Sequence, residues 1–321
     1  MSNNSCLESL GFSESQENII LNIRVSVACL SLIGSLTVIL LICLYQKHGF
    51  YYQRLILYYG IASTLSSTAY IVVTQCGRVN YSPASSAELD LCKAQGIWLM
   101  YTDWVVLLGN FGIMVNLIWG VFLLKSNVIL EILFLVASFI LPALPACIPL
   151  YNLNSYGSSG LWCWLQCKEI NSTYPYLGLY VWYVPLYTLI IVMFVMYLVV
   201  LVTVLYQRTK WHTSYDPLRD SSKKELFNSA LSLLGYPCVL FLVNVFPFID
   251  RLYQIILNRA SFPLLVLHVI FSPLPGVLML FIYAFDRETV RRLKWDHVKR
   301  FFKSSTPVQT YWIKRTSEDV T

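Results

Sequence analysis

Long apolar runs constrain the fold of this chain more than any other feature of its sequence. Runs of about 20 residues can cross a bilayer as helices, and the chain contains seven of them, at 20–45, 54–76, 94–124, 128–150, 178–206, 226–249 and 262–285. Only 12% of the 321 residues are charged, whereas soluble domains carry about 25%. We therefore predict an all-α membrane protein, a seven-transmembrane helix bundle over residues 20–285.

The segments outside these runs are short, and we expect no soluble domain. Residues 1–19 are expected to form an extracellular N-terminal segment, which lacks the basic residues and short apolar core of a cleaved signal peptide. Residues 286–303 combine apolar and basic positions in the pattern of an amphipathic helix that lies parallel to the membrane and binds anionic lipids. Residues 304–321 are expected to be a flexible cytoplasmic tail.

The basic residues predict the orientation of the chain. Most of the 23 Lys and Arg follow the first, third, fifth and seventh runs, and such residues accumulate on the cytoplasmic side. The N-terminus is then outside and the C-terminus inside, in a multi-pass protein of the plasma membrane. Three N-glycosylation acceptors, Asn3, Asn80 and Asn171, all fall on the predicted outer side.

A single carboxylate, Asp103, lies inside the third run, and no other acidic residue is expected so deep. Eleven residues separate it from Cys92, which corresponds to about 16 Å along a helix. A charge at that depth is costly unless it is paired or wetted, and we expect no Lys or Arg there. We therefore predict a polar pocket with Asp103 at its floor, and the candidate ligand-binding residues are Asp103, Trp98, Trp104, Asn110, Trp164, Asn244 and His268.

A structural role stays open as the alternative to ligand binding for several of these residues. Hydrogen bonding between helices is the favoured alternative for Asn110, Asn244 and His268, and Trp164 fits the aromatic belt at the lipid headgroups equally well. Cys92, at the outer end of the third run, is well placed to form a disulfide with the loop that follows the fourth run. Cys163 is the expected partner and Cys167 the alternative.

Seven spans with basic inner loops are typical of G-protein-coupled receptors. A retinal protein needs a Schiff-base lysine in its last span, but no lysine lies between Lys224 and Lys294. A zinc hydrolase needs several histidines within its spans, and only His268 of the four lies in one. We therefore expect no enzyme, cofactor or metal. The alternative is a transporter of a small solute in which Asp103 is the coupling carboxylate.

Four stretches resemble the cAMP-receptor-like family of G-protein-coupled receptors, which includes the slime-mould cAMP receptors and the fungal carbon-source-sensing receptors. These stretches are Cys92-Lys-Ala-Gln95-Gly96, the acidic position Asp103, Gly160-Leu-Trp162-Cys163-Trp164, and Tyr236-Pro237 with Phe246-Pro247-Phe248. The last apolar run departs from the family, because it reads Ser272-Pro-Leu-Pro-Gly276 where the family tends to have a Gln-Gly-Phe-Asn-like run.

The topology and the resemblance imply a receptor that binds an extracellular small molecule and activates a heterotrimeric G protein. The fifth and sixth spans would move about Pro185 and Pro237, and a lone carboxylate suits a cationic or hydroxyl-rich ligand. We expect membrane lipids as partners and no nucleic acid. The expected G-protein contacts are the inner basic residues Arg208, Lys210, Lys223, Lys224 and Arg287. The orientation rule for basic residues explains their position equally well.

Overall fold

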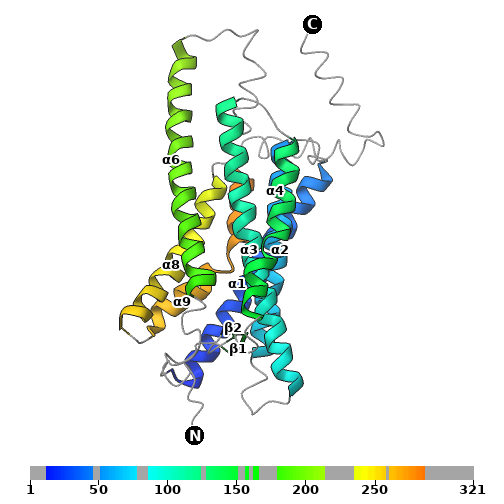
Figure 1. The fold of residues 1–321 in the computed structure, drawn as a ribbon, viewed down its shortest axis with the longest axis vertical. Helices are drawn as coiled ribbons and strands as arrows, with labels where there is room; N and C mark the ends of the chain where they lie inside the picture. Colours follow the sequence, from blue (N-terminus) through cyan, green and yellow to red (C-terminus); the bar gives the residue numbers. More distant parts are fainter. Residues whose placement is uncertain are drawn as a thin grey trace.

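The computed structural model describes residues 12–45, 51–77, 86–123, 128–150, 156–158, 162–165, 179–213, 235–257 and 260–285. Over these ranges the chain is a bundle of long helices with one short hairpin (Figure 1). Six helices in this part of the chain are long and apolar enough to cross a membrane, and a bent helix pair makes a seventh if it is counted as one span. The fold is thus a helical bundle of the membrane-embedded type with six or seven candidate spans.

The first three helices form one side of the bundle and begin earlier than the apolar runs predict. They are α1 (Glu14–Leu44), α2 (Tyr51–Gly77) and α3 (Ser86–Leu123). In α1 the cause is local, because Ser13 and Gln16 form a capping box that satisfies backbone N–H groups at the helix start. Six residues of the predicted N-terminal segment are therefore helical. Hydropathy misses such starts because capping residues are polar.

Proline residues divide the fourth predicted span. Its helix α4 (Val128–Ile140) stops before Pro142, and α5 (Ala143–Cys147) and the 3₁₀ turn η2 (Ile148–Leu150) follow. The next span begins with a π-helical turn, η3 (Leu179–Tyr183), and continues as α6 (Val184–Thr213). α6 extends seven residues past its predicted end, because the polar residues that follow the apolar run still favour a helix.

The sixth predicted span is shifted and the seventh is broken. α8 (Gly235–Leu257) ends eight residues beyond the predicted boundary at 249, and the predicted start at 226–234 lies outside the described residues. The run 262–285 forms α9 (Phe262–Phe271) and α10 (Pro275–Phe285), which meet at a bend of 54°. Pro275 has no N–H for the Phe271 carbonyl, which accepts from Leu274 instead. The prolines of this run, Pro273 and Pro275, were expected to kink it, and the bend lies where they occur.

A short antiparallel hairpin closes one end of the bundle beside the start of α1 (Figure 1). Its strands are β1 (Tyr156–Ser158) and β2 (Cys163–Leu165). The predicted Cys92–Cys163 disulfide is present and ties β2 to α3. Gly96 lets the hairpin approach α3 closely, because a Cβ at that position would lie 2.9 Å from the Tyr156 ring.

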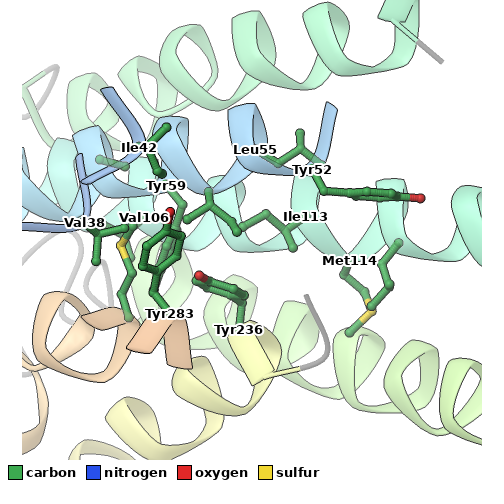
Figure 2. Close-up of a cluster of buried hydrophobic side chains, with 14 of the residues drawn as sticks. Val38, Ile42, Tyr52, Leu55, Tyr59, Val106, Ile113, Met114, Tyr236 and Tyr283 are labelled. Atoms are coloured by element: carbon green, nitrogen blue, oxygen red, sulfur yellow. The ribbon is translucent and has the colours of Figure 1, made fainter. Parts of the chain in front are cut away.

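The core of the bundle lies between α1, α2, α3, α8 and α10. Figure 2 shows Tyr59, Tyr236 and Tyr283 gathered from three of these helices around aliphatic side chains. α1 and α10 touch backbone to backbone, because a Cβ on Gly34 would lie 2.6 Å from the Gly276 carbonyl oxygen. The Gly276 N–H also donates to Ser31 Oγ at 2.9 Å. Small residues in the first span thus permit a close helix contact.

The outward faces of α4 and α6 are apolar. The Ile129 side chain is 80% exposed and that of Val202 is 65% exposed. Large apolar side chains this exposed are unusual on soluble proteins when they form a continuous face. These faces are the ones expected to contact lipid.

Candidate ligand-binding site

A cavity of about 80 Å³ lies inside the bundle next to the hairpin. One water molecule needs about 10–15 Å³ by the same measure, so the space suits several waters or one small solute. Residues of α1, α2, α3, α6, α8 and the α9–α10 bend line it together with the hairpin. Its polar lining consists of Arg24, Ser66, Tyr70, Asp103, Asn244, Arg251, His268 and Ser272.

Asp103 projects from α3 into this cavity, where two hydroxyl groups hold its carboxylate. Ser66 Oγ donates to Oδ1 at 2.9 Å and the Tyr70 hydroxyl donates to Oδ2 at 3.0 Å. Both donors come from α2, so the hydroxyl-rich face of that helix contributes to the site. A carboxylate accepts about four hydrogen bonds, so Asp103 keeps acceptor capacity toward the cavity.

Arg24 lines the same cavity from α1 although its side chain is almost fully buried, at 2% exposed. Its guanidinium carbon lies 4.1 Å from the Trp162 ring centroid and 4.9 Å from that of Tyr70. Within the part of the chain that the structure describes, Arg24 makes no hydrogen bond or ion pair, and its Nη1 is buried without a partner. Among the described residues, this buried cation is held by the two aromatic rings alone.

The position of Arg24 corrects one sequence-based expectation. We expected no cation near Asp103 and counted Arg24 among the outer basic residues. The two residues border one cavity and interact electrostatically, although no nitrogen–oxygen distance between them falls within 4 Å. The signal was available, because Arg24 lies inside the first apolar run, and an ionisable residue in a span is itself evidence for a site.

Two further carboxylates lie inside the bundle among the described residues. Asp250 is fully buried near the end of α8, and Glu131 of α4 is 2% exposed. The Asp250 carboxylate lies 2.8 Å from His268 Nδ1 and accepts from Gln254 Nε2 at 3.0 Å. These two carboxylates escaped notice because Asp250 follows the predicted end of its span and Glu131 lies at the start of its run.

A second polar cluster thus borders the cavity at the junction of α8 and α9. Arg251 Nη1 donates to Gln254 Oε1 at 2.7 Å, so Asp250, Arg251, Gln254 and His268 form a connected network. His268 lies in the cavity lining. It also makes a hydrogen bond between helices, which was the structural alternative kept open for it.

The structure brings together four of the seven predicted ligand-binding residues. Asp103, Trp164, Asn244 and His268 line the cavity. Trp164 packs against Trp182 of the π-helical turn with ring centroids 5.4 Å apart. Asn244 Nδ2 donates to the Leu240 carbonyl within its own helix at 2.8 Å.

Three predicted residues lie away from the cavity lining. Trp98 is 37% exposed on the outside of α3. Trp104 is buried and packs against Trp182 with ring centroids 5.5 Å apart. Asn110 is fully buried and donates to the Tyr59 hydroxyl of α2 at 3.2 Å, which is the interhelical role kept open for it.

The hairpin roof contributes two aromatic walls to the cavity, Trp162 and Trp164. Its attachment explains the Cys-x-x-Gln-Gly stretch of α3: Cys92 bonds the hairpin and Gly96 makes room for it, while Gln95 is buried at 3% exposed. Both polar atoms of the Gln95 amide lack a hydrogen-bond partner in the described part of the chain. Unsatisfied polar groups therefore gather at this end of α3.

Several other predictions fall outside the described residues. These are the acceptors Asn3, Asn80 and Asn171, the basic residues Lys223, Lys224 and Arg287, and the amphipathic helix at 286–303. Arg208 and Lys210 lie near the end of α6, but their side chains are not described. All of these stay predictions.

Comparison with known proteins assigns this chain to no family. A scan against protein-family models found no match, and a search of curated proteins found no relative. The resemblance to cAMP-receptor-like receptors therefore stays a prediction. Fold and site define the class: a helical protein of the membrane-embedded type with an internal polar cavity. No cluster of three or more metal-binding side chains occurs among the described residues.

Proposed function

We propose that this protein is a receptor of the G-protein-coupled type that binds an extracellular small molecule in the cavity between Arg24 and Asp103. The observation that carries the proposal is a buried arginine and a half-buried aspartate that line one cavity without forming an ion pair. Buried charges without partners are costly. A site that leaves both charges unpaired therefore favours a ligand that carries a countercharge for each of them.

The roof of the cavity supports an extracellular ligand. Disulfides form outside the reducing cytosol, and the Cys92–Cys163 bond lies at the cavity end of the bundle. The hairpin that it holds supplies Trp162 and Trp164 to the cavity wall. The cavity end is then the outer end, which agrees with the orientation that the basic residues predict.

Signal transmission would begin at the cavity walls that belong to α6 and α8. Leu186 and Tyr187 come from α6, and Asn244 and Pro247 come from α8. Pro247 is the better placed hinge, because it interrupts α8 at the cavity, whereas Pro237 lies in the first turn of that helix. A ligand that contacts both helices shifts the population between two arrangements, and the inner ends of these helices would bind the G protein.

Nucleotide exchange tests this function directly. The purified protein in lipid nanodiscs is mixed with a panel of heterotrimeric G proteins and with candidate ligands, and exchange is measured for wild type, Asp103→Asn and Asp90→Asn. Asp90 lies on the same helix and is exposed, so it controls for loss of a charge. The expected result is ligand-stimulated exchange that only Asp103→Asn abolishes. No exchange with any partner would refute the receptor.

A transporter is the second candidate, and the break between α9 and α10 favours it. Ser272 and Pro275 at this break line the cavity, and broken helices line the solute sites of many transporters. Solute flux into liposomes that requires Asp103, without nucleotide exchange, would establish this alternative.

A further inference from the structure

We infer that the cavity binds a small zwitterion of the α-amino acid class, with its carboxylate on Arg24 and its ammonium group on Asp103. This inference rests on the proposed role of the cavity as a ligand site, and it requires neither G-protein coupling nor transport. It extends the sequence-based expectation of a cationic ligand, which took account of Asp103 alone.

Arg24 presents the geometry that a carboxylate requires. The guanidinium group is planar and carries five N–H donors at its edges. Its central carbon lies over the rings of Trp162 and Tyr70, which accept none of its N–H groups in conventional hydrogen bonds, and the buried Nη1 has no partner among the described residues. A carboxylate bound to two parallel N–H groups would satisfy these donors and neutralise the cation.

Asp103 presents the complementary geometry for an ammonium group. Its two oxygens each accept one hydroxyl hydrogen bond, from Ser66 and from Tyr70. Hydroxyl donors do not neutralise the carboxylate, and Asp103 lines the cavity with acceptor capacity to spare. An ammonium group offers three donors and one positive charge, which supply what this carboxylate lacks.

Tyr70 sets the separation between the two charges. Its ring lies beneath the Arg24 guanidinium at 4.9 Å, and its hydroxyl donates to Asp103 at 3.0 Å. One side chain therefore spaces the cation from the anion and keeps them from forming an ion pair. An α-amino acid carries its two charges on a single carbon, so it fits two protein charges that are close but not paired.

Charge matching excludes the simpler ligand classes. A cationic amine would leave Arg24 without a countercharge, and an anion would leave Asp103 without one. A neutral sugar would leave both charges unpaired. Arg251, the other arginine of the lining, belongs to the network that Gln254 and His268 form with the Asp250 carboxylate. The apolar lining, Val106, Leu107, Leu186 and Leu240, offers room for an aliphatic side chain.

Isothermal titration calorimetry on the full-length protein in nanodiscs tests the inference. The probes are L-alanine and L-leucine, with matched analogues that lack one charge. Propionate and 4-methylpentanoate lack the ammonium group, and ethylamine and isopentylamine lack the carboxylate. At least one amino acid is expected to bind about tenfold or more tightly than either of its analogues, because each analogue loses one charged hydrogen-bonding group.

Two variants assign the two ends of the ligand. Arg24→Gln should abolish the preference for the amino acid over the amine, and Asp103→Asn should abolish its preference over the carboxylate. Arg24→Lys keeps the charge but loses the planar fork, so it should bind more weakly than wild type while remaining folded. Lys93→Gln and Asp90→Asn, which remove charges from the outer part of α3, should bind like wild type.

Three results would overturn the inference. They are equal affinity for an amino acid and one of its single-charge analogues, tighter binding of glucose, and no binding of either amino acid to the wild-type protein. The receptor proposal is separable: amino-acid binding without nucleotide exchange would support the inference and refute the receptor. Exchange stimulated by another ligand, without amino-acid binding, would do the reverse.

Discussion

Two arginine–carboxylate arrangements in this bundle differ in whether the two charges form an ion pair. Between α2 and α4, Arg54 Nε donates to Glu131 Oε1 at 2.6 Å and Nη2 donates to Oε2 at 2.7 Å. The Tyr58 hydroxyl adds a third hydrogen bond to Glu131 at 3.1 Å. Around the cavity, Arg24 and Asp103 share the aromatic neighbour Tyr70 but form no ion pair.

The contrast separates a structural pair from a binding site. Arg54 and Glu131 satisfy each other in a bidentate geometry, and the contact joins two helices. Arg24 and Asp103 each keep unsatisfied capacity toward a shared cavity. Each arrangement combines an arginine with a carboxylate, and the pairing separates a group that holds the fold from one that awaits a ligand.

The largest expected effect comes from breaking the satisfied pair. Arg54→Met leaves Glu131 buried without a cation, which should lower the free energy of unfolding by about 3 kcal/mol, the low end for such losses because Arg54 is partly exposed. Unfolding in SDS, followed by tryptophan fluorescence, measures it. Arg54→Met/Glu131→Leu should recover most of the loss. A single variant within about 1 kcal/mol of wild type would contradict a structural role for the pair.

Ligand protection should act on the other arrangement alone. At about 100 times its Kd, a bound amino acid raises the free energy of unfolding by about 2.7 kcal/mol. We expect this gain in wild type and in Arg54→Met, and at the same ligand concentration a gain of about 1.4 kcal/mol or less in Asp103→Asn, because its affinity is expected to fall tenfold or more. The same SDS titration with and without L-leucine measures it. Equal protection of Asp103→Asn would show that the ligand binds elsewhere.

Two tyrosine variants compare the arrangements at a single hydroxyl. Tyr70→Phe leaves Asp103 with Ser66 as its hydroxyl donor among the described residues and should cost about 2 kcal/mol, as for other hydrogen bonds to charged groups. Tyr58→Phe should cost about 1 kcal/mol or less, because Arg54 still satisfies Glu131. Both variants keep their rings. The reverse order in parallel unfolding measurements would mean that the Asp103 carboxylate is not held by its hydroxyl donors.

The smallest expected effect is that of Asp103→Asn on stability. The amide can still accept from Ser66 and can donate to the Tyr70 hydroxyl, and no ion pair is lost. The free energy of unfolding should therefore change by less than about 1 kcal/mol. A much larger loss would assign Asp103 a structural role like that of Glu131.

The sequence predicts the helical membrane-embedded class and places most helices, because apolar runs longer than a core helix leave few alternatives. It also places the Cys92–Cys163 bond and identifies Asp103 as an unusual residue. The ends of the helices were predicted less accurately. The polar cap at Ser13 extends α1, and two prolines divide the last predicted span, a break that hydropathy averages away.

The partners within the site could not be read from the sequence. Arg24 and Asp103 are far apart in the chain, and the packing of α1 against α2 and of α2 against α3 brings them to one cavity. Trp98 is near Asp103 in sequence yet points away, because helix periodicity places it on another face. Nearness to Asp103 in the sequence was therefore a poorer predictor of a site residue than the presence of a charged side chain within a span.

The contact between Gly34 and Gly276 limits how this sequence can vary. Many helix contacts tolerate a larger residue on one side when the facing residue becomes smaller. Here both positions already hold the smallest residue, and each faces the backbone of the other helix. No compensating substitution exists for either one, so a change at this crossing can be accommodated only if α1 and α10 move apart.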